Sequence, residues 1–230
     1  ITNLSMLNSI DDANYLIEEF TISYHYSASL TFKKTKESPA NKKVLISAPV
    51  FKTKNEFDIA PLPMSEKESR AIANMALKNS YKTELLIAEN ATEAYFKKHA
   101  YQSNIIHIAT HTEIDKRNNN YSTIYFHPTS GQKENGKLTL AETYNIKMSP
   151  DLLTLSSCES GVGNLIKGEG MISFTRGFSY SGARNIVFSL WKVNDKYASD
   201  TMVEFYRLIF SGVDYSSSLR EAKLKILKAH

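Results

Sequence analysis

Two side chains of this sequence could act together as a nucleophile and a base, those of Cys158 and His111. Each follows an apolar run, residues 103–110 before the histidine and residues 151–157 before the cysteine. A free thiol has a pKa of about 8.5 and is only partly ionised at neutral pH, so its attack on a carbonyl needs a neighbouring base. An imidazole can hold the thiolate and later protonate the leaving amine. The two residues therefore predict a cysteine–histidine dyad.

The elements that must position this dyad alternate between strands and helices. Short, β-branched apolar runs predict strands over residues 43–50, 83–88, 103–110, 121–127, 151–157 and 184–191, and a weaker run predicts one over 20–27. Apolar i, i+3/i+4 spacing predicts helices over residues 65–79, 91–99, 170–181, 195–210 and 216–228, and a helical turn over 138–144. The first of these helices is expected to begin with Ser65 as its N-cap and Glu68 three residues later. The alternation predicts an α/β fold, with a mostly parallel central sheet and helices on both of its faces.

The expected position of the dyad in such a sheet follows from the strand ends. Ligands of open parallel sheets bind outside the carboxyl ends of the strands. If the strands before His111 and Cys158 are neighbours, both residues emerge at the same edge of the sheet. His111 also lies 47 residues before Cys158, close to the about 50 residues that separate the same pair in caspases.

Cys158, His107 and the nearby glycines could instead have purely structural roles. A lone cysteine is often an inert, buried residue, but the polar, glycine-containing loop after Cys158 favours a reactive one. His107 points to the same face as His111 by the two-residue period of a strand, and is expected to be a packed histidine rather than a ligand. The glycines at positions 161, 163, 168 and 170 match no phosphate-binding fingerprint and are expected to shape the loop.

The composition excludes several other classes of function. A single cysteine rules out a disulfide within the chain and a Cys-based zinc site, and a metal site built on His107 and His111 lacks a third ligand. No metal and no cofactor is therefore expected. The formal net charge is +4, without the one-sided basic surface that would indicate nucleic acid as a partner. No apolar run approaches the roughly 20 residues that span a bilayer, so no membrane partner is expected, and the cysteine usage suits a cytoplasmic location.

A series of motifs runs along the second half of the chain: Ile106-His-Ile-Ala-Thr-His111, Leu155-Ser-Ser-Cys-Glu-Ser-Gly-Val-Gly163, Gly168-Glu-Gly170, Gly182-Ala-Arg-Asn-Ile-Val-Phe-Ser-Leu-Trp191 and Val193-Asn-Asp195. This series resembles the CHAT family of caspase-like cysteine peptidases, which belong to one clan with caspases and separase. The resemblance implies a single CHAT-type domain over residues 1–230 with a caspase-like fold. It also implies that the N-terminal edge of the domain, about residues 1–40, is truncated.

The resemblance also implies roles for individual residues. His111 would be the general acid/base and Cys158 the nucleophile. The backbone N–H groups of Cys158 and Thr112 would form the oxyanion hole, with Thr112 at a position where such enzymes often have glycine. Losing one oxyanion donor typically costs about 10²–10³ in rate, so this position matters for activity.

The segment from Ser189 to Asp195 is the candidate substrate-binding wall. It follows the strand expected to lie beside the cysteine strand, so Ser189, Trp191 and Asp195 are expected to bind the substrate side chain before the scissile bond. Asn194 and Asp195 directly precede the following helix, and both residue types favour an N-cap, so a capping role is an equally good alternative for them. Trp191 could instead belong to the core, as aromatic residues at strand ends often do.

Two functions remain open on the sequence. The first is a cysteine endopeptidase, a thiol protease that cleaves a protein or peptide substrate through an acyl-thioester on Cys158. The second is a catalytically inactive caspase-like interaction or regulatory module. Family members often carry helical repeats beside the peptidase, so a regulatory helical-repeat region or partner protein outside this chain is implied.

Overall fold

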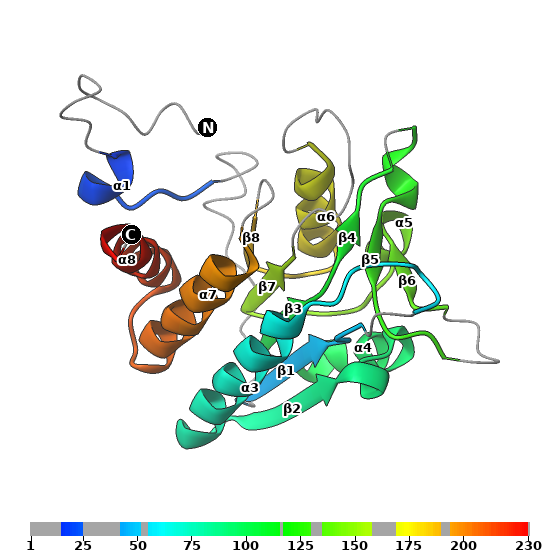
Figure 1. Ribbon diagram of the computed structural model, residues 1–230, viewed down its shortest axis with the longest axis horizontal. Coiled ribbons are helices and arrows are strands. Elements are labelled where there is room, and N and C mark those ends of the chain that lie inside the picture. Colours follow the sequence, from blue (N-terminus) through cyan, green and yellow to red (C-terminus); the bar gives the residue numbers. More distant parts are fainter. Residues whose placement is uncertain are drawn as a thin grey trace. The chain divides into compact units, whose positions relative to one another are not determined.

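The computed structural model describes residues 15–24, 42–51, 55–115, 117–129, 135–157, 169–189 and 194–229 (Figure 1). The chain divides into two compact units, one formed by Ile1–Thr35 with Asp200–His230 and the other by Lys36–Ser199. A single domain over residues 1–230 stays a prediction. No helix in the described part of the chain is both long enough and apolar enough to cross a membrane.

The larger unit is built on a five-stranded sheet in which every neighbouring pair of strands is parallel. The strand order is β2-β1-β3-β7-β8, and the bounds are Lys43–Ala48 for β1, Lys82–Ile87 for β2, Ile105–Ala109 for β3, Leu152–Ser156 for β7 and Asn185–Phe188 for β8. Each strand overlaps a strand predicted from the sequence. The predicted α/β fold with a mostly parallel sheet is therefore confirmed.

The central strands are covered on both faces, which explains why their sequences are mostly apolar instead of alternating between apolar and polar residues. β1 and β3 are buried at every position. Alternate residues of the strands point to opposite faces. Leu45, Ile106 and Leu153 lie on one face, where they form a core cluster with Phe96 and Phe174.

Helices cover the two faces of this sheet (Figure 1). α3, Pro63–Lys78, packs against β1, β2 and β3 on one face. On the other face, α4 (Glu93–His99), α5 (Leu140–Thr143) and α6 (Glu169–Tyr180) contribute side chains to the core cluster. The 3₁₀ turns of this unit are η3 (Ala88–Asn90), η4 (Ala100–Gln102) and η5 (Asn119–Tyr121).

The start of α3 differs from the prediction. Leu62 is the N-cap, without a side-chain capping bond, and Pro63 opens the helix with a φ angle already suited to it. Ser65 lies inside the first turn, where its hydroxyl donates to the carbonyl of Leu62 at 2.7 Å. The capping box predicted at Ser65 and Glu68 was therefore wrong. Both side chains are buried.

A small antiparallel sheet lies beside the end of β3. It consists of β4 (Thr112–Glu113), β5 (Thr123–Tyr125) and β6 (Lys137–Thr139). β5 falls within the strand predicted at 121–127. Its antiparallel pairing with β4 and β6 was not predicted, because strands of two or three residues are too short to show an alternating apolar pattern in the sequence.

The smaller unit contains α1 (Leu16–Glu19), α8 (Tyr215–Lys228) and the part of α7 (Asp195–Phe210) that begins at residue 200. Within this unit the guanidinium of Arg220 donates from Nε to the carbonyl of Ile17 at 2.7 Å. Residues 20–24 form no strand, so the strand predicted at 20–27 was wrong over that part, and residues 25–27 lie outside the described residues.

Candidate active site

The strands that precede His111 and Cys158 are direct neighbours in the sheet. β3 pairs with β7 in parallel, and the N–H of Thr110 donates to the carbonyl of Ser156 at 3.2 Å. The segments after β3 and β7 therefore leave the sheet at the same end, where the carboxyl ends of the parallel strands lie. His111 is among the described residues, whereas Cys158 lies outside them, directly after Ser157. The neighbouring strands agree with the sequence analysis, and the dyad itself stays a prediction.

The imidazole of His111 is buried, with 5 % of the residue's surface exposed. Its Nε2 lies 2.7 Å from the carbonyl oxygen of Ala60. A carbonyl can only accept a hydrogen bond, so Nε2 carries the proton, and in the neutral ring Nδ1 carries the lone pair. Nδ1 is buried and has no hydrogen-bond partner among the described residues. The ring is thus held in the tautomer in which Nδ1 can accept a proton.

Burial lowers the pKa of His111 below its ordinary value of 6.5. The Ala60 carbonyl and the negative charge of Asp195 raise this pKa and offset part of the effect of burial. The imidazole is therefore neutral at pH 7, which is the form that a general base needs. Because its pKa is lower in the folded protein than in the unfolded chain, His111 reduces the stability of the fold as the pH falls from 6.5 through the folded pKa.

Ala60 is a residue of this site that the sequence did not indicate. It contributes a backbone carbonyl, which any residue type can supply, so no sequence signal marks it. The His111 ring also faces Phe51, with ring centroids 6.1 Å apart. Phe51 lies just after β1, which is the neighbour of β3 in the sheet.

Thr112, the predicted oxyanion residue, begins β4. The N–H of Tyr125 donates to the carbonyl of His111 at 3.0 Å, and hydrogen-bonded positions alternate along an antiparallel pair. The N–H of Thr112 therefore points to the edge of β4 that faces away from β5. The Thr112 hydroxyl lies 3.4 Å from that of Ser157. The residue after His111 and the residue before Cys158 are thus in contact.

Ser189 and Asp195 line a small cavity beside Ser157. The cavity has a volume of about 10 Å³, which is room for about one water molecule. Its other walls come from Leu62, Ser65, Glu68, Thr110, Ser156 and Ala198. Hydroxyls and two carboxyl side chains therefore surround a space next to the predicted dyad.

The helix cap at the start of α7 is Asn194 rather than Asp195. The side-chain oxygen of Asn194 accepts from the N–H of Lys196 at 3.1 Å, and its backbone carbonyl accepts from the N–H of Ala198 at 2.9 Å. Asp195 instead faces the cavity and is close enough to His111 for its charge to raise the pKa of that imidazole. Trp191, the other predicted substrate residue, lies outside the described residues.

Glu68, which lines this cavity, belongs to a buried carboxyl–imidazole pair with His107. Glu68 Oε1 is 3.0 Å from His107 Nε2, and the two side chains are 3 % and 0 % exposed. His107 is therefore packed, in agreement with the expectation from the sequence. The role of Glu68 was missed because its spacing from Ser65 also fits a capping box, and only the packing of α3 on β3 distinguishes the two.

Replacing Glu68 by alanine should lower the free energy of unfolding by about 2–4 kcal/mol, because it leaves the buried His107 without its carboxylate. Glu66→Ala on the same helix is the matched control. Glu66 makes an exposed i, i+4 pair with Arg70, so its removal should cost less than about 0.5 kcal/mol. Urea unfolding of the three proteins measures the difference. Equal losses in both variants would show that the buried pair adds no stability.

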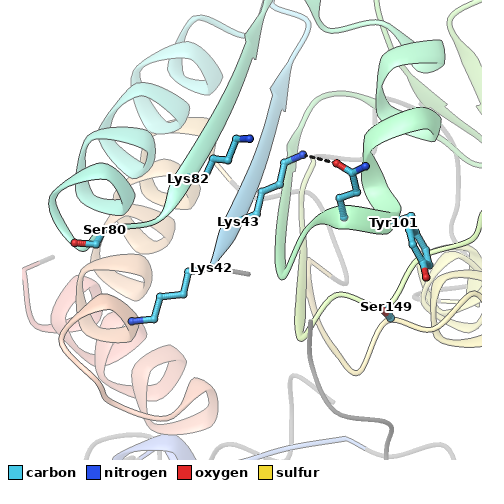
Figure 2. Close-up of a pocket in the computed structure, with 7 residues that line it drawn as sticks. Lys42, Lys43, Ser80, Lys82, Tyr101 and Ser149 are labelled. Carbon is cyan, nitrogen blue, oxygen red and sulfur yellow. Dashed lines mark hydrogen bonds between the residues drawn. The ribbon is translucent and has the colours of Figure 1, made fainter. Parts of the chain in front are cut away.

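A larger cavity among the described residues lies at the opposite end of the strands (Figure 2). It has a volume of about 690 Å³ and is lined by Lys42, Lys43, Ser80, Lys82, Tyr101, Gln102 and Ser149. Lys43 and Lys82 begin β1 and β2, which places this cavity at the amino ends of the parallel strands. Lys43 Nζ is engaged by Gln102 and Glu84 at 3.2 and 3.0 Å. The cavity therefore lies far from His111, which follows the carboxyl end of β3.

A metal site finds no support in the described part of the chain. Nowhere among those residues do three or more His, Cys, Asp or Glu side chains gather closely enough to hold an ion. His107, the histidine nearest in sequence to His111, is instead paired with the carboxyl group of Glu68.

Comparisons with known proteins place this chain in a family. The family model described as "CHAT domain" matches residues 3–230. A mouse protein, Tetratricopeptide repeat protein 28, is 29% identical over 92 residues, which are 40% of this chain and 4% of that protein. The chain therefore spans a very small part of this curated relative.

Solved structures show the same fold. The Arg-specific cysteine proteinase gingipain R superposes with a TM-score of 0.55 at 9% identity, over 85% of this chain and 44% of the gingipain chain. The complex of Porphyromonas gingivalis RgpB pro- and mature domains matches with the same TM-score and identity, over 84% of this chain and 44% of that one. The chain thus has a caspase-like α/β fold and spans less than half of these proteins. Since the family model covers nearly its whole length, the protein belongs to the CHAT domain family.

Proposed function

We propose that this protein is a cysteine endopeptidase with Cys158 as its nucleophile and His111 as its general acid/base. In the proposed reaction, His111 Nδ1 takes the thiol proton and the sulfur bonds to the carbonyl carbon of the substrate. The amide C–N bond then breaks as the imidazolium returns the proton to the leaving amine. Water hydrolyses the resulting thioester, with His111 as the base, and the thiol is regenerated.

The observation that carries this proposal is the state of the His111 ring. Its Nε2 is engaged by the Ala60 carbonyl, while its buried Nδ1 has no partner among the described residues. A buried imidazole nitrogen without a partner is costly unless another group uses it. The parallel pairing of β3 with β7 supports Cys158 as that group, because the two strands end side by side.

The proposed oxyanion hole consists of the backbone N–H groups of Thr112 and Cys158. Two observations support Thr112. Its N–H points away from β5, and its side chain contacts Ser157, the residue before the proposed nucleophile. Such donors stabilise the negative oxygen of the tetrahedral intermediate.

The proposed substrate pocket is formed by Ser189, Trp191 and Asp195. Asp195 favours a Lys or Arg side chain before the scissile bond, because it lines the cavity beside Ser157 and its negative charge acts on His111. Gingipain R, which has the same fold, is described as Arg-specific. We propose a protein or peptide substrate bound as an extended strand.

The remaining proposals concern the cellular setting of the domain. A regulatory helical-repeat region or partner outside this chain is supported by the mouse relative, whose name refers to tetratricopeptide repeats. A cytoplasmic location is supported by the single cysteine, which suits a reducing compartment.

An inactive regulatory module is the second candidate, and the size of the cavity favours it. A volume of about 10 Å³ admits no Lys or Arg side chain, so a peptidase would have to widen this space when substrate binds.

Labelling by a thiol-directed peptide electrophile distinguishes the two candidates. Cys158 is the only cysteine, so mass spectrometry of the intact chain reports its reaction alone. A peptidase should react at least about tenfold faster with the peptide electrophile than with a non-peptidic reagent that carries the same reactive group, because binding orients the reagent. The rate should persist below pH 6.5, since burial lowers the pKa of His111. Equal rates with both reagents would favour the regulatory module.

A further inference from the structure

The side chain of Asn55 makes three hydrogen bonds to the backbone of the loop that carries Ala60. Its Oδ1 accepts from the N–H of Phe57 at 3.1 Å and from the N–H of Ile59 at 3.3 Å. Its Nδ2 donates to the carbonyl of Ile59 at 2.7 Å. Asn55 therefore binds both backbone polar groups of Ile59, the residue directly before Ala60.

The same loop is anchored by an aromatic side chain. Phe57 lies edge-on to Phe51 with ring centroids 6.1 Å apart, and its ring is 5.1 Å from that of Tyr125. Phe51 also faces the His111 ring. The loop thus rests on residues that flank His111, while Asn55 sets the direction of its backbone.

A turn at Asp58 completes the loop. The N–H of Asp58 donates to the carbonyl of Asn55 at 3.2 Å, and Asp58 has a φ of 51°, in the left-handed region. Aspartate tolerates this region better than most residues, but the conformation still has a cost. A strained turn persists only where surrounding contacts hold it, and the three Asn55 hydrogen bonds are such contacts.

We infer that Asn55 is a positioning residue that sets the tautomer of His111 through the Ala60 carbonyl. Holding both polar groups of Ile59 restricts rotation of the chain just before Ala60, and this keeps the Ala60 carbonyl directed at His111 Nε2, 2.7 Å away. The Nε2–H tautomer leaves the lone pair on Nδ1, where the proposed reaction needs it. The effect on the tautomer is independent of the proposed function, and only its effect on catalysis rests on it.

Removing the Asn55 side chain should allow the second neutral tautomer of His111 to form. In Asn55→Ala the Ala60 carbonyl is no longer directed at Nε2, so the neutral imidazole should distribute between its two tautomers. In the Nδ1–H form the nitrogen needed as a base is already protonated. An even distribution halves the population with a free Nδ1 lone pair, and a ring without its Nε2 partner is also less well oriented, so we expect kcat to fall about twofold or more. KM should stay nearly unchanged, since a misplaced histidine proton impairs the chemical step rather than binding.

The test measures the His111 ring directly by ¹⁵N NMR of histidine-labelled protein at a pH where the ring is neutral. The wild type should show a protonated Nε2 and an unprotonated Nδ1. Asn55→Ala should bring the two shifts toward each other. Asn55→Asp keeps an acceptor for the N–H groups of Phe57 and Ile59, so it should retain most of the wild-type pattern and of kcat.

Asn118→Ala is the matched control. The Asn118 side chain accepts from the N–H of Asn120 at 3.0 Å in an exposed loop, a turn of the same kind without a bond to the His111 loop. It should leave the His111 signals and kcat unchanged. If Asn55→Ala does not fold, Asn55→Leu, which has a similar branched shape and no hydrogen-bonding group, takes its place.

The outcomes separate this inference from the proposed function. Unchanged His111 signals in Asn55→Ala, or in its leucine replacement, would overturn the positioning role whatever the activity. A shifted tautomer in a protein that cleaves no peptide would leave the positioning role standing and count against the peptidase.

Discussion

Replacing Cys158 by alanine should abolish peptide cleavage, with a loss of at least about 10³-fold in kcat/KM, because no other thiol exists in the chain. His111→Ala should cause nearly the same loss. The double variant should be hardly slower than either single one, since groups that act as one unit are not additive. Cleavage of a fluorogenic peptide by the three variants and the wild type measures the effect.

A matched control is available in His99→Ala. His99 is also a partly buried histidine, stacked on Tyr95 and paired with Glu84 at 3.2 Å, but it lies on α4 outside the proposed site. Its removal should leave cleavage within about threefold of the wild type once folding is verified by circular dichroism. Wild-type turnover in Cys158→Ala would show that the nucleophile is assigned wrongly.

Replacing Asp195 by asparagine should slow cleavage after Lys or Arg by about 10- to 100-fold. A charge-assisted hydrogen bond to the substrate cation is worth roughly 1.5–3 kcal/mol, and the amide cannot supply it. A peptide pair that differs only in Arg or Leu before the scissile bond measures the selectivity. The Leu peptide should change less than about threefold, because the amide has nearly the shape of the carboxylate.

The neighbouring cap provides the control for this experiment. Asn194→Ala removes the side chain that caps α7 and leaves the Asp195 carboxylate in place. It should lower stability by about 1 kcal/mol and affect both peptides equally. If Asp195→Asn lowers cleavage of both peptides to the same small extent, Asp195 does not recognise substrate charge and the proposed basic specificity is wrong.

Several features of the site follow from local sequence. Continuous apolar runs produce buried parallel strands, and the residues directly after such runs must lie at the carboxyl edge of the sheet. The apolar run before His111 therefore places this residue at the end of the sheet where ligands bind. The expectation that His107 is packed rests on the same argument, since it lies in the middle of β3.

Other features depend on contacts between distant segments, and here sequence patterns were ambiguous. Ser65 and Glu68 fit a capping box, but Pro63 starts the helix earlier and α3 turns Glu68 toward His107. Asp195 fits a cap as well as a pocket wall, and Asn194 takes the cap. A short-range pattern cannot distinguish such roles, because the deciding partner lies elsewhere in the chain.

The sequence by itself determined the five strands of the parallel sheet, the end of that sheet at which His111 lies, and the family. The tertiary structure alone decided the protonation of His111. Its Nε2 partner is the carbonyl of Ala60, 51 residues earlier in the chain, and Asn55 binds the residue before Ala60. The physical reason is that every residue carries the same backbone carbonyl, so its direction is set by the fold around it and not by its residue type.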